Sequence, residues 1–161
     1  DVYKRQHLQT NKARAVAESF DWLHTLDSLK LARKLSTGRQ GAGNALKVLL
    51  QINIAGDPDK YGLSPEAAVG VVDELLAADL PEIDLRGLMT IGQRSATHDQ
   101  RRAEFAALRE LGADYARRFG ERYFTELSMG MSDDFEAAIT EGATIVRVGS
   151  AIFGPRPAGG P

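Results

Sequence analysis

The 161-residue sequence contains no cysteine, which removes disulfides, thiol catalysis and zinc–thiolate sites together. Its net charge is only -2, from 20 basic and 22 acidic residues, so it lacks the broad basic surface with which proteins bind nucleic acid. No apolar run approaches the ~20 residues of a membrane-spanning helix. The first residues, DVYKRQ, are polar and do not resemble a secretory signal. We therefore expect a cytoplasmic protein with no nucleic-acid or membrane partner.

Histidine is scarce and poorly placed for metal binding. His7, His24 and His98 show none of the spacings of metal ligands, so we expect no metal site. His24 stands inside the apolar run WLHTL, where a packed or hydrogen-bonded core histidine is the commoner role.

The sequence does contain an alternation of short apolar runs and longer periodic segments. Hydrophobic residues make up 43% and charged residues 26%, which is typical of one globular domain with a sizeable core. The alternation predicts a parallel β/α architecture. Periodicity alone leaves open whether five strands form a doubly wound sheet or most of a barrel. We predict strands at residues 22–26, 46–54, 83–91, 125–129 and 144–148.

Capping residues predict where the helices begin. Ser64-Pro65 opens one helix, and Thr97 with Gln100 has the spacing of a capping box. Asp27 is predicted to cap a third helix, and the Gly-rich stretch at 36–44 to be a loop. We predict helices at residues 11–20, 27–35, 65–79, 97–120 and 133–141.

The first candidate site follows the predicted strand at 125–129. Gly130 lets a ligand approach the backbone, and Ser132 offers a hydroxyl group. The free N–H groups at the start of the next helix point to the same place, which suits a phosphate. A plain strand-to-helix turn, with Ser132 or Asp133 as N-cap, explains the same residues. This turn by itself leaves both interpretations open.

The second candidate site follows the last predicted strand. Gly149 and Ser150 supply backbone and hydroxyl donors, and Arg147 places a fixed charge near the strand's end. The alternative is a surface turn with Arg147 in a structural ion pair. The two segments support each other, because barrels often bind phosphate with the loops after their last two strands. Lys60 and Gly62 are weaker candidates for lining the site's mouth, since a loop lysine is usually solvated.

Four segments, in this order and spacing, resemble the pyridoxal 5′-phosphate (PLP) homeostasis proteins, and the last segment is highly specific for that family. They are HLQTNK at 7–12, VLLQINI at 48–54 followed by KYG at 60–62, LRGLMTI at 85–91, and ELSMGMSDDFEAAITEGATIVRVGSAIFG at 126–154.

The resemblance implies a (β/α)8 TIM barrel of the alanine-racemase N-terminal-domain type, with about five of its eight strands present. Residues 7–154 would be the C-terminal two-thirds of this single PLP-binding domain. Residues 1–6 do not fit the family pattern and are expected to be non-native, and 155–161 to be a disordered tail. The family's Schiff-base lysine lies on the first strand, upstream of this chain, so we expect no catalytic residue here.

The resemblance also implies the cofactor contacts. Ser132 and the Gly149-Ser150 turn would hold the PLP phosphate, Arg147 would lie near the pyridine nitrogen, and Met131 and Asn53 would be neighbours of the cofactor. The implied function is intracellular PLP homeostasis without known substrate turnover, by a protein that is monomeric at full length. The alternative is a PLP-dependent, racemase-like enzyme.

Overall fold

The computed structural model describes residue 8 and residues 12–93 and 96–154. The predicted non-native start at 1–6, the predicted tail at 155–161 and most of the HLQTNK segment lie outside these residues.

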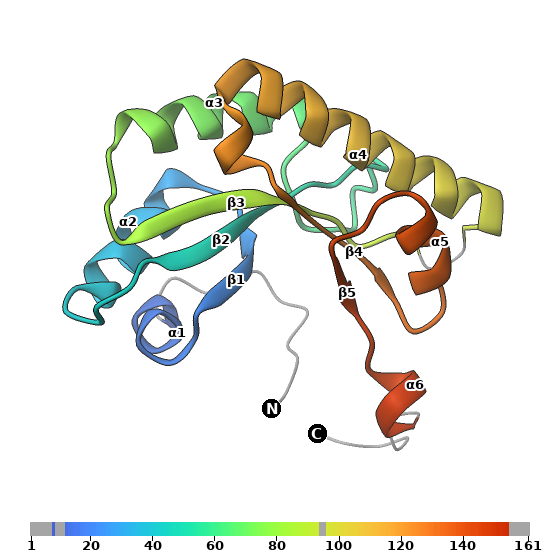
Figure 1. Ribbon diagram of the computed structural model, residues 1–161, viewed down its shortest axis with the longest axis horizontal. Helices are drawn as coiled ribbons and strands as arrows, with labels where there is room; N and C mark the ends of the chain where they lie inside the picture. The colour runs from blue at the N-terminus through green and yellow to red at the C-terminus, as the bar shows by residue number, and fades with distance from the viewer. Residues whose placement is uncertain (1–7, 9–11, 94–95, 155–161) are drawn as a thin grey trace.

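A single parallel sheet forms the centre of the described chain, with its five strands side by side in chain order (Figure 1). Both the number of strands and their parallel pairing confirm the prediction. The strands are β1 (Trp22–Leu26), β2 (Leu46–Gln51), β3 (Ile83–Met89), β4 (Glu126–Met131) and β5 (Ile145–Arg147).

The sheet is strongly curved. Oγ of Ser128 on β4 lies 3.0 Å from Nδ1 of His24 on β1, although two strands stand between them. In a flat sheet these strands would lie about 14 Å apart, because neighbouring strands are separated by ~4.8 Å. A serine and a histidine could not meet over that distance. The strands therefore wrap into the arc of a barrel.

Helices connect the strands, and α3 and α4 run along one side of the sheet (Figure 1). Ser64 caps α3, and Thr97 and Gln100 form the predicted capping box at the start of α4. Within residues 12–93 and 96–154, no helix is both long and apolar enough to span a bilayer. The helices are α1 (Ala13–Ser19), α2 (Leu29–Arg39), α3 (Pro65–Ala77), α4 (His98–Phe119), α5 (Phe135–Thr140) and α6 (Ser150–Phe153), with a 3₁₀ turn, η2 (Glu121–Tyr123).

Helix α2 differs from the prediction at both ends. Ser28 is the N-cap rather than Asp27, and its hydroxyl accepts a hydrogen bond from the third residue of the helix. The helix also continues to Arg39, through residues predicted as loop. A Cβ atom on Gly38 would lie 3.2 Å from Cβ of Ala17. This glycine therefore lets α1 and α2 pack closely and does not end the helix.

Arg39 is buried at the junction of α1, β1 and the loop before β2. Its Nη1 donates to the carbonyl oxygens of Ala17 at 2.7 Å and Phe20 at 2.8 Å. Its Nη2 donates to the side chains of Asp21 at 2.9 Å and Asn44 at 2.6 Å. The guanidinium thus satisfies carbonyls at the end of α1 that the helix itself leaves unpaired.

The remaining elements occur where predicted, with shifted ends. Strands β2 and β3 stop earlier than predicted, and the Thr90 hydroxyl beyond β3 donates to the Ile52 carbonyl at 2.9 Å. Strand β4 continues to Met131 because that residue pairs with Arg147 of β5. Helix α5 and strand β5 are both shorter than predicted: turns flank α5, and a bend and irregular backbone flank β5.

The hydrophobic core lies between the sheet and its helices. On β2, Leu46, Val48 and Leu50 belong to this core, whereas Lys47 is exposed on the other face. Met129 is fully buried in the core. The opposite, inner face of the sheet carries the buried Leu49 together with the buried polar residues Ser128 and Thr90, and the candidate site lies on that face.

Gly87→Ala should destabilise the sheet. A Cβ atom at this position would lie 1.9 Å from the backbone oxygen of Glu126 on the paired strand, so β3 and β4 would have to separate. We expect the free energy of unfolding to fall by at least about 2 kcal/mol, measured as a lower urea midpoint.

The matched control for this substitution is Gly70→Ala in α3. A Cβ atom there meets nothing within 4 Å, and alanine favours a helix over glycine by roughly 0.5–1 kcal/mol. Equal urea midpoints for the two variants would contradict a close approach at Gly87.

Candidate phosphate and ring site at the strand ends

The turns after β4 and β5 meet at Ser132. Its Oγ accepts hydrogen bonds from the backbone N–H groups of Gly149 at 3.1 Å and Ala151 at 3.2 Å. Ser150, the first residue of α6, lies between them and is exposed. The structure thus brings together three of the sequence-predicted residues, Ser132, Gly149 and Ser150.

The turn that carries Ser132 is held by Gly130 and Asp134. Gly130 has φ of +90°, and a Cβ atom there would lie 2.6 Å from Cβ of Ala138, so glycine lets α5 fold back onto β4. Oδ1 of Asp134 accepts from the Met131 N–H at 2.6 Å, and Oδ2 lies 3.6 Å from Arg101 of α4. Asp134 therefore fixes the turn. It also occupies the N-cap position of α5, which the interpretation as a plain strand-to-helix turn assigned to Ser132 or Asp133.

Arg147 points across the inner face of the sheet. Its Nη1 donates to Oγ of Ser128 at 2.7 Å, and its Nη2 donates to the carbonyl oxygen of Thr90 at 2.7 Å. These contacts join β5 to β4 and to the end of β3. In these two contacts the acceptors are a hydroxyl oxygen and a carbonyl oxygen.

His24 completes the inner face, and its predicted hydrogen-bonded role in the strand is confirmed by its contact with Ser128. The Trp22 ring meets it edge-on, with ring centroids 6.0 Å apart. Burial and, to a smaller extent, the nearby charge of Arg147 together lower the pKa of His24 to about 4. The imidazole is therefore neutral at physiological pH.

Three more sequence-predicted residues, Asn53, Lys60 and Gly62, lie on the loop between β2 and α3. The Asn53 side chain bonds the backbone of this loop, donating to Asp57 O at 2.8 Å and accepting from Asp57 N at 3.1 Å. Nζ of Lys60 donates to Gly92 O at 2.7 Å, so this lysine bridges two loops instead of being solvated. A Cβ atom on Gly62 would lie 2.8 Å from the Asn53 nitrogen, which explains the glycine by close approach.

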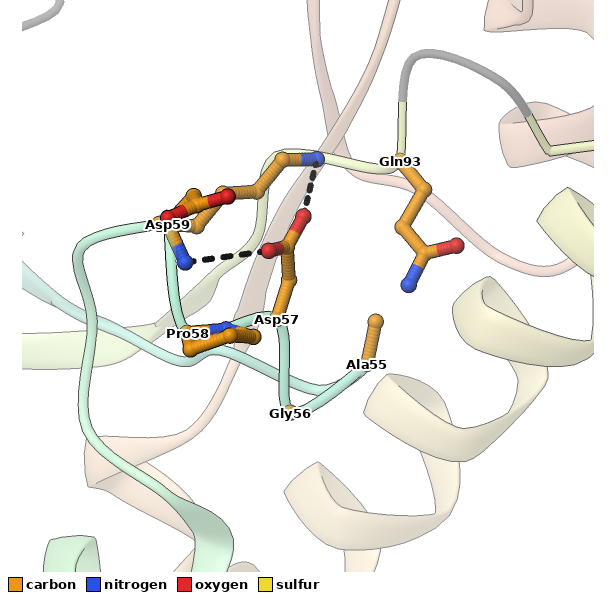
Figure 2. A pocket seen from close by; sticks show the side chains of 7 residues that line it. Ala55, Gly56, Asp57, Pro58, Asp59 and Gln93 are labelled. Atoms are coloured by element: carbon orange, nitrogen blue, oxygen red, sulfur yellow. Dashed lines mark hydrogen bonds and ion pairs between the residues drawn. The ribbon is translucent and has the colours of Figure 1, made fainter.

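Lys60 also lines two hollows, and Figure 2 shows the larger one. There the Asp57 carboxylate lies between the Lys60 ammonium and the backbone of Asp59 (Figure 2). The carboxylates of Asp57 and Asp59 disfavour a phosphate in this hollow. The larger hollow, about 660 Å³, is lined by residues 55–60 and Gln93, and the other, about 430 Å³, by residues 27, 28 and 60–63.

Two residues of the inner face were missed by sequence reasoning. Ser128 and Thr90 are both fully buried polar residues, with exposures of 0% and 1%. The available signal was a serine inside the otherwise apolar strand LSMGM, four residues before Ser132. In the part of the chain that the structure describes, no group of three or more His, Asp or Glu side chains could hold a metal ion.

A sequence profile of the alanine racemase N-terminal domain family matches residues 4–157. The chain belongs to this family. A protein of Pseudomonas aeruginosa named pyridoxal phosphate homeostasis protein is 45% identical over 154 residues, which cover 96% of this chain and 64% of that protein. The chain spans 61–64% of the length of the first curated relatives it matches. These findings confirm the resemblance found in the sequence.

Solved structures of the family show the same fold. PipY of Synechococcus elongatus, solved with PLP bound, is 38% identical and has a TM-score of 0.83, over 92% of this chain and 68% of PipY. An alanine racemase of Clostridium difficile is 21% identical with a TM-score of 0.67, over 95% of this chain and 41% of the racemase. At that identity the likeness shows the fold alone. The prediction of a partial (β/α) barrel of the alanine-racemase type is confirmed.

Acidification should destabilise the protein partly through His24. Its pKa is lowered from the usual 6.5 to about 4 in the folded state, so the unfolded state binds more protons between these values. Stability is therefore lost as the pH falls through this range. The urea midpoint should drop between about pH 7 and about pH 5, and it should drop less in the His24→Asn variant.

Protonation of carboxylates also destabilises the protein on acidification, but this contribution is the same in the wild-type chain and in the His24→Asn variant. Hydrogen bonds from Arg39 and Arg102 lower the pKa values of Asp21 and Glu141, respectively, and both carboxylates are present in the variant as well. An identical pH dependence in the two proteins would show that His24 does not titrate in this range.

Proposed function

We propose that the chain binds PLP, with the phosphate at the turns after β4 and β5 and the ring beside Arg147. The observation that carries the proposal is the meeting of Ser132 with the N–H groups of Gly149 and Ala151. These atoms follow the last two strands of the chain, as in many phosphate-binding barrels. Family membership, the PipY structure with PLP bound and the names of the relatives support the proposal.

The turn fits a phosphate on two counts. The Ser132 hydroxyl can donate as well as accept, and backbone N–H groups are good donors to phosphate oxygens. A Cβ atom on Gly149 would meet nothing within 4 Å, so the space beside this backbone is open. Gly149 has a negative φ of −124°, outside the left-handed region that favours glycine. The open space beside it would give a ligand access to the backbone.

Arg147 would face the pyridine nitrogen of the bound ring. When bound, PLP supplies an electron-withdrawing ring whose strength depends on protonation of that nitrogen. A guanidinium has only donors and keeps its charge, so Arg147 disfavours a second positive charge beside it. Arg147 would thus make the ring a poorer electron sink than an acidic partner would, which is compatible with a carrier or with a racemase-like site.

Met131 and Asn53 stay in the proposal with different roles. Met131 is half-buried at the end of β4, one residue before Ser132, where its side chain would pack beside the ligand. Asn53 would act by shaping the loop that contains Lys60, because its amide already bonds the backbone there.

For the whole protein we propose PLP homeostasis in the cytoplasm. A monomeric protein would hold the cofactor and release it, without turning over a substrate. The relatives' names support this role.

Ser132→Ala should weaken PLP binding, because a hydrogen bond to a charged group is lost. The expected cost is about 1.5–3 kcal/mol, or roughly tenfold to 150-fold in Kd. Gly149→Leu should weaken binding more, because its side chain would fill the open space beside the turn. Both effects are measured by titrating the 161-residue chain with PLP and following the cofactor's absorbance.

Ser19→Ala is the matched control, since Ser19 is exposed at the end of α1, away from the strand ends. Its PLP affinity should equal that of the wild-type chain. Unchanged affinity in both Ser132→Ala and Gly149→Leu would overturn the phosphate assignment.

The racemase-like alternative makes a different prediction. If the protein is a carrier, the chain incubated with PLP and L-alanine should racemise it no faster than PLP alone. Circular dichroism of the amino acid follows the reaction. Racemisation above that background, lost on replacing Arg147 with alanine, would favour the enzyme over the carrier.

A further inference from the structure

His24 is connected to Arg147 through one buried hydroxyl group. Oγ of Ser128 lies 2.7 Å from Nη1 of Arg147 and 3.0 Å from Nδ1 of His24. Ser128 has no exposed surface, so solvent does not compete for its hydroxyl. The three side chains come from β5, β4 and β1 and form a relay across the inner face of the sheet.

The chemistry of the three groups sets the direction of this relay. Arginine carries donors only, so Ser128 must accept from Arg147. A hydroxyl group has one hydrogen, and the remaining contact of Ser128 is Nδ1 of His24. Ser128 can donate this hydrogen to Nδ1 only if Nδ1 is unprotonated. The neutral imidazole then carries its proton on Nε2.

We propose that His24 is a positioning residue: as the neutral Nε2–H tautomer it accepts the Ser128 hydroxyl hydrogen and thereby fixes the guanidinium of Arg147 for the ring of the ligand. This role rests on the proposed binding of PLP. It adds to that function a residue on β1, far in sequence from the turns that would hold the phosphate.

The relay matters because the guanidinium is planar and rigid. Two anchors, Oγ of Ser128 and the carbonyl oxygen of Thr90, fix its plane. Two hydrogen bonds hold Thr90 in turn: its hydroxyl donates to the Ile52 carbonyl oxygen, and its N–H donates to the Ser128 carbonyl oxygen. If the Ser128 side chain turned about its Cα–Cβ bond, Oγ would move away from Nη1 and this anchor would be lost. The hydrogen bond to His24 holds Oγ in place.

The tautomer can be measured without any ligand. Nitrogen-15 NMR of the imidazole ring in the 161-residue chain should show His24 protonated at Nε2 and unprotonated at Nδ1. Ser128→Ala should remove the hydrogen bond and leave a mixture of tautomers. A proton on Nδ1 in the wild-type chain would overturn the relay.

Two substitutions at His24 test its effect on ligand binding. His24→Asn keeps an acceptor at about the place of Nδ1, whereas His24→Leu removes it. We expect His24→Leu to weaken PLP binding about tenfold, the usual effect of one hydrogen bond beside a charge, and His24→Asn to restore near wild-type affinity. Affinity for inorganic phosphate should be unchanged in both, because the relay acts on the ring end of the site.

Each remaining outcome decides the question. Equal PLP affinities for the two variants, or an equal loss for inorganic phosphate, would overturn a positioning role. If His24→Leu does not fold, Ser128→Ala takes its place in the same comparison. If the wild-type chain binds no PLP, the proposed function fails and so does the ligand role of His24, while the NMR result still decides whether the relay exists.

Discussion

The inner face of the sheet depends on one permanent charge. Arg147 sits on a strand of only three residues, and its guanidinium reaches β4 and the end of β3. A guanidinium cannot lose its proton in a protein, so it must be surrounded by acceptors wherever it is buried. A hydroxyl and a carbonyl oxygen supply two of these acceptors. The buried polar residues Ser128 and Thr90 on the inner face follow from this constraint.

In the proposed site, the backbone groups for the phosphate and the group for the ring lie only a few residues apart in the sequence. The N–H groups at 149 and 151 and the Ser132 hydroxyl would face the phosphate, and Arg147, two residues before Gly149, would face the ring. Because both groups follow the last strands of the chain, a ligand with a phosphate at one end and a ring at the other can meet both. The loop of Lys60 and Asn53 borders the same rim from the β2 side.

The fold was largely predictable from the sequence, because strands and capped helices depend on local patterns. Ser64 and Thr97 cap helices where their spacing indicates, and the five apolar runs are the five strands. The extension of α2 was not predictable, since Gly38 serves a contact with α1 that is distant in sequence.

The site was predictable only in part, for the same reason. The phosphate turns carry their signal in consecutive residues, Gly130 to Ser132 and Gly149-Ser150. The contact between His24 and Ser128 joins residues 104 positions apart and arises only when the sheet curves. The engagement of Asn53 with its own loop also depends on the path of the backbone, which no short motif fixes.

Arg39 has a consequence for how this end of the molecule opens. Its guanidinium bonds the end of α1, the start of β1 and the loop before β2, and it is only 4% exposed. Releasing any one of these segments alone would leave a buried charge with too few hydrogen-bond acceptors. The opening with the lowest free-energy cost is therefore the one that exposes the whole guanidinium to water. Helices α1 and α2 with β1 therefore form a single cooperative unit, whose amides exchange with solvent together instead of fraying one segment at a time.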